Sequence, residues 1–261
     1  MQSAEQESLL LRQMAALRRS GLSQDQALVH AADGLPRGPL AVRVAAARRV
    51  LESGAQSNAD PLLSNGTTPV AALDHAAGAL DARLSADAAL AMTRLYATIA
   101  LAGPLALGGV LAWVTPDLMS IVGEAPNAWV VLMTVFGALR FLGIPLAIGV
   151  SLLIGHGGER LAPGVSRIRQ AAALLQAAAA DQDPLKIISN PTDMAYFSIR
   201  RAQVGVAQSA AELAGELVQE GEHAASLFRH LAPPAAAVLG VFILIPALLL
   251  FGFPLFSLAS M

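Results

Sequence analysis

The stretch from Leu95 to Val114, LYATIALAGPLALGGVLAWV, decides the fold predicted for this chain. It contains no charged residue, and Arg94 and Asp117 stand on either side of it. A helix needs about 20 apolar residues to cross about 30 Å of hydrocarbon, and this stretch has that length. The chain is apolar again from Ala128 to Gly155. We therefore predict a membrane hairpin of two helices, because a backbone in lipid must satisfy its own hydrogen bonds.

The composition agrees with membrane helices rather than with the alternative, a pair of core helices in a soluble domain. A third uncharged stretch, Ala235 to Ala259, lies near the C-terminus. The chain is 55% hydrophobic and 14% charged, with a mean hydropathy of +0.56, which is more apolar than an ordinary soluble protein. Charged residues concentrate in 1–94 and 159–230, so polar regions alternate with apolar ones. The chain has no cysteine, which excludes disulfides and thiolate metal sites.

Both polar regions have helical patterns. In the first, Ser23 and Gln26 form a predicted capping box, and Pro39 suits a first helical turn. In the second, Pro163 and Pro191 suit helix starts. The helices predicted from these signals are Glu7 to Arg19, Ser23 to Ala32, Leu40 to Ser53, Ala71 to Leu95 with breaks near Gly78 and Ser85, Pro163 to Ala180, and Met194 to Gln219 with Gly205 inside it.

The basic residues predict the orientation in the membrane. The turn between the first two apolar stretches contains Asp117 and Glu124 and no basic residue, whereas residues 1–94 hold nine arginines and 159–230 hold seven Lys and Arg. Basic residues stay on the cytoplasmic side, so the N-terminus is predicted to be cytoplasmic. The predicted fold class is all-α: a membrane protein with three transmembrane helices and two small cytoplasmic helical-bundle domains. In order, the parts are a domain at 1–94, a span at 95–114, an outside turn and interfacial helix at 115–140, a span at 141–155, a domain at 156–232 and a span at 233–261.

Arg140 lies in the middle of the second apolar stretch and has two interpretations. As an intramembrane charge it would cost about 2.5–3.5 kcal/mol and would indicate a functional site. Alternatively, the helix from Trp129 to Leu139 lies at the outer surface, and the span begins at Phe141. We prefer the second interpretation, which places Arg140 among the outer headgroups.

A weak internal repeat links the two polar regions. Ile168 to Leu174, IRQAAAL, is similar to Leu11 to Leu17, LRQMAAL. With this repeat and the domain–span–span–domain–span order, nearly the whole chain resembles the GspF or PilC family, the inner-membrane platform proteins of type II secretion systems and type IV pili. Three further matches are the helix pair from Arg12 through Ser20-Gly21-Leu22, the first span with Pro104 inside it and Pro116 at its outer end, and the segment from Pro126 to Arg140. The chain departs from the family's Gly-Glu-x-Ser-Gly motif, because only Gly78 and Gly205 remain at the corresponding places.

No residue set with catalytic chemistry is present in the sequence, so we predict a protein that is not an enzyme and has no catalytic residue, cofactor site or metal site. The only lysine, Lys186, follows no glycine-rich loop. Small residues four apart, Gly108 with Ala112 and Gly143 with Ala147, are typical of close helix packing in membranes. Arginines are the candidate contacts for acidic lipid or an acidic partner, the alternative being solvated helix faces. They are Arg12, Arg18, Arg19, Arg43, Arg48, Arg49, Arg200 and Arg201.

The resemblance implies a platform in the bacterial inner membrane that couples a cytoplasmic assembly ATPase to pilin or pseudopilin subunits. Other inner-membrane assembly proteins, membrane lipid and further copies of the chain are the remaining partners, and nucleic acid is not one. A different hypothesis is a membrane component of a small transporter or permease, with Arg140 lining its pathway. Pro104, Pro116 and Arg140 are predicted to have structural roles in the membrane under the platform hypothesis.

Overall fold

A computed structural model describes residues 2–34, 38–53, 60, 62–63, 69–122, 141–157 and 162–259. These residues form helices and turns without a strand, which confirms the all-α prediction for the described ranges. The chain divides into two compact units. The first combines Met1–Ala89 with Pro163–His223, and the second combines Leu90–Ala162 with Ala224–Met261. The first unit therefore contains most of both polar regions, and the second contains the apolar stretches.

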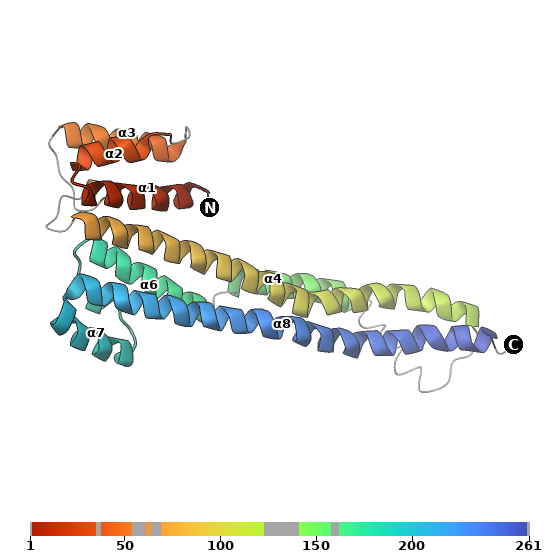
Figure 1. Cartoon of the computed structure of the whole chain (residues 1–261). Helices are drawn as coiled ribbons and strands as arrows, with labels where there is room; N and C mark the ends of the chain where they lie inside the picture. Colours follow the sequence, from red (N-terminus) through yellow and green to blue (C-terminus); the bar gives the residue numbers. More distant parts are fainter. Residues whose placement is uncertain are drawn as a thin grey trace. The chain divides into compact units, whose positions relative to one another are not determined.

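The first unit begins with one copy of a small helical domain, whose helices start where local sequence predicts. Its helices are α1 (Gln2–Arg19), α2 (Gln24–Ala32), α3 (Pro39–Glu52) and the N-terminal part of α4 (Pro69–Val122) (Figure 1). The predicted capping box is confirmed: Gln26 N donates to Ser23 Oγ, and Ser23 N donates to Gln26 Oε1. Pro39 stands at the start of α3, where its missing N–H costs no helical hydrogen bond.

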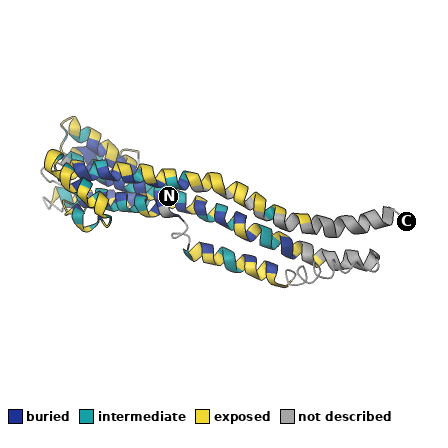
Figure 2. Ribbon diagram, turned by 90° about the horizontal axis from the view of Figure 1, so that it is seen from below, coloured by how far each residue is buried: buried dark blue, intermediate teal, exposed yellow. Residues whose placement is uncertain are grey.

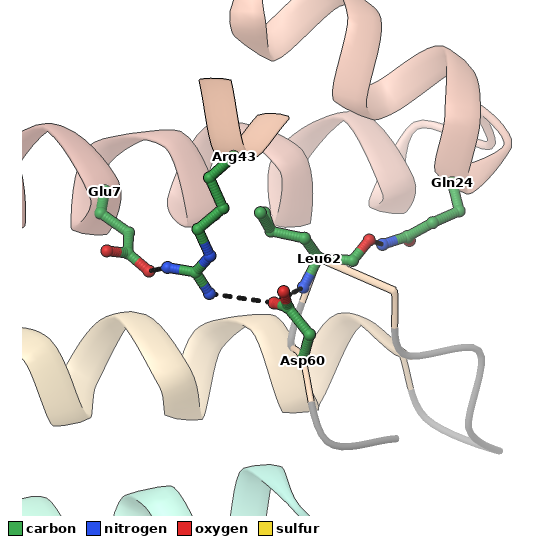
Figure 3. A network of polar contacts seen from close by, with 5 residues as sticks. All are labelled: Glu7, Gln24, Arg43, Asp60 and Leu62. Carbon is green, nitrogen blue, oxygen red and sulfur yellow. Dashed lines mark hydrogen bonds and ion pairs between the residues drawn. The ribbon is translucent and has the colours of Figure 1, made fainter. Parts of the chain in front are cut away.

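The core of this copy is built from leucine, methionine and alanine side chains. Leu10, Leu11 and Met14 of α1 are almost fully buried against Leu28 of α2 and Leu73 of α4. Asp60 and Leu62, which stand between α3 and α4 in the chain, form hydrogen bonds in this bundle (Figure 3). There Gln24 donates to the Leu62 carbonyl at 3.0 Å, and the Leu62 amide donates to Asp60 at 3.1 Å.

A second copy follows in the same unit. Its elements are α6 (Pro163–Ala179), the short 3₁₀ helix η1 (Pro184–Lys186), α7 (Pro191–Val204) and the N-terminal part of α8 (Val206–Ala259). Asn190 caps α7, because its side chain accepts from Thr192 N at 3.1 Å. The core of this copy surrounds Phe197 and includes Leu174, Leu213 and Leu217.

Several predicted helix ends are wrong, and glycine and proline explain the differences. Helix α7 ends at Val204, and Gly205 takes φ +89°, a backbone conformation that glycine adopts without strain. The predicted helix from Met194 to Gln219 is therefore two helices. Conversely, α4 has no break at Gly78 or Ser85, since the alanine-rich sequence around them favours helix.

Two long helices also continue through prolines, and the first of these prolines was predicted to stand at the outer end of a span. Helix α4 continues through Pro116 to Val122, beyond the predicted turn at Thr115. Helix α8 continues through Pro233 and Pro234 to Ala259. A proline removes one helical hydrogen bond, and the flanking residues, rich in alanine, leucine and methionine, retain enough bonds for the helix to persist. The predicted interfacial segment 123–140, with Arg140, lies outside the described residues.

In the second unit the buried residues are small and many large apolar side chains are exposed, which is the opposite of an ordinary soluble core. Figure 2 shows exposed residues along each of its described helices, and these include many large apolar side chains. Its buried residues are mostly small, such as Ala97, Ala100 and Ala147. A Cβ on Gly143 would lie 2.9 Å from Gly109 Cα, so α4 and the helix Phe141–Gly157 meet backbone to backbone. Small residues at helix contacts with large residues outside are typical of membrane helices.

Length and composition allow one described helix to cross a membrane. It covers Val70–Val110, with a mean hydropathy of 1.4 in its most apolar part. The helix Phe141–Gly157 is apolar but shorter. The described residues thus contain one candidate span.

We predict that Gly221→Ala lowers the unfolding free energy by about 1–3 kcal/mol, because overpacking a tight contact forces the backbone to shift. A Cβ on Gly221 would collide with Ile168 Cγ1 and lie 2.6 Å from the Gly164 carbonyl oxygen, where α8 crosses α6. Thermal unfolding of the purified full chain, followed by circular dichroism, measures the change.

Gly215→Ala is the matched control on the same helix, since nothing lies within 4 Å of its added Cβ. Alanine there should stabilise the helix by roughly 0.5–1 kcal/mol. Equal effects of the two substitutions would contradict the close crossing of α6 and α8.

Candidate functional site

The N-terminal part of α4, which belongs to the first copy, contacts both α1 of that copy and α6 of the second copy. Arg12 of α1 forms an ion pair with Asp81 of α4. Arg169 of α6, which occupies the same place in the sequence repeat as Arg12, lies 3.8 Å from Asp87 of α4. The repeat in the sequence is therefore a repeat of contacts, with each copy directing one arginine to an aspartate of α4.

Asp81 has a second partner, which is buried. Ser8 of α1 is only 4% exposed, and its hydroxyl donates to Asp81 Oδ1 at 2.5 Å. A buried hydroxyl requires a hydrogen-bond partner, whereas the Arg12–Asp81 pair is largely exposed to solvent. The contact that matters more for stability is therefore the one from Ser8.

The surface where the two copies meet is rich in alanine and hydrogen bonds. Arg83 of α4 donates to Gln176 of α6, and Ser85 donates to Glu222 of α8 at 3.1 Å. Gly78 of α4, one of the two motif glycines, allows a close approach, because a Cβ there would lie 3.3 Å from Leu175. This seam joins residues about a hundred positions apart in the sequence.

Two hollows flank Arg83 along the seam. The first has a volume of about 330 Å³ and is lined by polar and charged groups from α1, α3, α4 and α6, namely Glu7, Arg43, Arg83 and Gln176, together with alanines and leucines. The second, also about 330 Å³, is lined by Arg83, Asp87, Arg169 and two alanines. Each hollow is lined by two arginines and one carboxylate, so the carboxylate offsets half of the arginine charge.

Most of the candidate partner-facing arginines have partners within the first unit. Arg19 pairs with Asp74, Arg48 with Glu52, and Arg18 donates to the Leu22 carbonyl. Such contacts hold the helices of the unit together and leave these arginines less available to a partner protein.

Arg43 and Arg200 have the strongest carboxylate contacts of the set. Burial lowers the pKa of Arg43, but the charges of Asp60 and Glu7 outweigh burial and raise that pKa above its usual value (Figure 3). Hydrogen bonds and charge from Glu212 raise the pKa of Arg200, whose guanidinium lies 2.6 Å from that carboxylate. Both arginines therefore stay charged and have structural roles.

Arg49 and Arg201 differ from the others. Both are exposed, and neither has an ion-pair partner within the described ranges. They also occupy equivalent places, because α3 and α7 each have 14 residues, begin with proline, and carry an Arg-Arg pair at the same position. In each pair the first arginine binds a carboxylate of its own copy, Glu52 or Glu212, and the second faces solvent.

The sequence analysis did not identify the aspartates of α4. Asp74, Asp81 and Asp87 bind arginines from α1 and α6, and helical periodicity alone predicts only that they lie on a polar face. One signal was available: Asp74 and Asp81 are seven residues apart, as are Arg12 and Arg19, so each pair lies on one face of its helix.

The remaining site predictions concern the second unit and metal binding. Pro104 and Pro116 lie inside α4, and Arg140 is outside the described residues. Among the residues that the structure describes, no group of three or more His, Asp or Glu side chains is arranged to hold a metal ion.

Comparison with known proteins gives no assignment. No family model, no curated protein and no solved structure matches the chain. The resemblance to the platform family therefore stays a prediction that rests on the residues quoted for it.

We predict that Asp81→Ala destabilises the first unit by about 1–3 kcal/mol, because it leaves the buried Ser8 hydroxyl without its acceptor. Asp74→Ala, which removes only the exposed pair with Arg19, should cost about 0–1 kcal/mol. Urea unfolding of the full chain, followed by circular dichroism, measures both. A larger loss for Asp74→Ala would show that the exposed pairs, rather than the Ser8 hydrogen bond, hold α1 on α4.

Proposed function

We propose that this chain is a membrane-anchored assembly platform of the type II secretion and type IV pilus kind. One observation carries the proposal: two sequence-related helical copies, separated in the chain by an apolar hairpin, pack as one polar unit on the same helix α4. The domain–span–span–domain–span order brings such copies together when both lie on one side of a membrane. The resemblance of the sequence to the platform family supports the same proposal.

The proposed arrangement has three spans in the bacterial inner membrane and a cytoplasmic N-terminus. It is supported by the exposed large apolar side chains of the second unit and by the helix of α8, which extends through the uncharged stretch Ala235 to Ala259. The distribution of basic residues supports the orientation. The first unit is then the cytoplasmic part of the protein.

The proposed mechanism is mechanical. A cytoplasmic assembly ATPase binds the first unit, and its motion is passed along α4 and α8, which each extend from the first unit into the second without a break. The apolar helices, together with other inner-membrane assembly proteins, then move pilin or pseudopilin subunits out of the membrane into a filament. No covalent chemistry by this chain is required.

Arg49 and Arg201 are the proposed contacts for the ATPase. They are exposed, have no carboxylate partner in the described part of the chain, and occur once in each copy. An acidic partner surface with two matching patches would complement them, and such charges contribute more to specificity and association rate than to affinity.

We predict that the double variant Arg49→Glu/Arg201→Glu weakens ATPase binding about tenfold and reduces filament assembly, since each charge reversal at an exposed contact costs about 0.5–1 kcal/mol. Binding is measured by co-purification of the full chain with its ATPase after mild crosslinking. Lys186→Glu, at another exposed cation of the same unit, is the control and should leave binding unchanged. Arg49→Lys/Arg201→Lys should retain most of it.

Deletion of the protein tests the function as a whole and should abolish filament assembly or secretion. Normal assembly and secretion after deletion would refute the platform. Recovery of a solute-binding protein or a nucleotide-binding transporter subunit, in place of an assembly ATPase, would favour the permease hypothesis.

A further inference from the structure

Each of the three helices of the second unit carries a basic or imidazole side chain at the same end. Arg94 on α4, and Arg229 with His230 on α8, lie within about two turns of the residues where this unit begins, Leu90 and Ala224. The helix Phe141–Gly157 carries an exposed histidine in its last turn, before the unit ends at Ala162. These basic and imidazole side chains therefore lie near the boundary between the polar and apolar parts of the chain.

Large exposed apolar side chains begin directly beside these basic residues. Leu95 follows Arg94 and is 53% exposed, and Leu231 follows His230 and is 66% exposed. On the returning helix, Leu153 is 73% exposed and lies one turn before its histidine. A hydrocarbon surface therefore starts where the basic side chains stand.

In the described stretches next to these basic residues, no carboxylate of the second unit offsets their positive charge. The stretches 90–110, 141–157 and 224–245 contain no Asp or Glu, and Glu159 with Arg160 lie outside the described residues. Arg94 is half-buried, and its Nε has no hydrogen-bond partner within the described ranges. In the first unit, by contrast, Arg12 and Arg19 each pair with an aspartate.

Backbone carbonyl groups of α8 near this boundary also need a polar environment. Pro233 and Pro234 lack N–H groups, so the carbonyls of Arg229 and His230 lose their helical partners. An unpaired carbonyl in hydrocarbon costs several kcal/mol, whereas the headgroup region supplies water. The two prolines and the two basic residues therefore all favour the depth of the lipid headgroups.

We propose that Arg94 and Arg229 bind the phosphate groups of anionic phospholipids in the cytoplasmic leaflet. The inference rests on the proposed function, specifically on its claim that the second unit crosses the membrane. A guanidinium fork matches a phosphate in shape and charge, and its aliphatic stem lies along the apolar surface while its head reaches the phosphate. Lipid phosphate supplies the missing negative charge.

The test uses the full chain in nanodiscs made from equal parts of phosphatidylcholine and phosphatidylglycerol. After extraction into mild detergent, native mass spectrometry counts the lipids that remain bound. We expect the wild-type chain to retain phosphatidylglycerol, and Arg94→Gln/Arg229→Gln to reduce its ratio to phosphatidylcholine about tenfold, since each basic residue at a membrane surface contributes a several-fold preference. Arg94→Lys/Arg229→Lys should restore part of the preference, because charge remains without the fork.

The controls separate the alternatives. Lys186→Gln removes an exposed cation of the first unit and should leave lipid retention unchanged. Addition of inorganic phosphate to the detergent solution should not displace the lipid, and displacement would overturn the proposal in favour of a site for soluble phosphate. An unchanged lipid ratio in the Gln variant, or a wild-type chain that retains both lipids equally, would also overturn it.

Failure of the proposed function would look different from failure of the lipid site. A chain that enters nanodiscs of pure phosphatidylcholine but shows no preference for phosphatidylglycerol crosses the membrane without the lipid site. A chain that enters no nanodisc refutes the membrane-spanning arrangement, and the lipid site with it.

Discussion

The first unit depends on one constraint: α1 and α6 both pack against the same helix, α4. Asp81 accepts from Ser8 and Arg12 on one side, and Asp87 lies near Arg169 on the other. Because α4 is rich in alanine and has a glycine at position 78, two helices can approach it closely. A bulky α4 would hold one copy and exclude the other, so the small side chains matter as much as the ion pairs.

The second unit follows the opposite rule of packing. Its contacts are made by small residues, as where Gly109 meets Gly143, and its leucines and isoleucines face outward. In water such a surface would be a large aggregation-prone patch, since soluble proteins rarely expose contiguous apolar areas of this kind. In lipid the same surface costs nothing, and close packing of small residues supplies the attraction between helices. The second unit therefore has the packing pattern that is typical of membrane helices.

Local sequence predicted the parts of the fold that local chemistry controls. Ser23, Pro39 and Asn190 start helices because their side chains or missing N–H groups satisfy the first helical turn. The pairing of Arg12 with Asp81 joins residues 69 apart, and the Arg83–Gln176 contact joins residues 93 apart. Helical periodicity places each residue on a face of its helix but does not say which faces meet. Proline was a poor predictor of where a helix ends. Pro116 and Pro233 lie inside helices because neighbouring residues compensate for one lost hydrogen bond.

The boundary between the polar and apolar parts of α4 lies within continuous helix. Between Gly78 and Gly103, α4 contains neither glycine nor proline, and the boundary at Ala89–Leu90 falls inside that stretch. Kinks in helices arise at proline, at glycine or serine pairs, or at inserted bulges. The described α4 is helical across the boundary and has no glycine or proline there at which a kink would form.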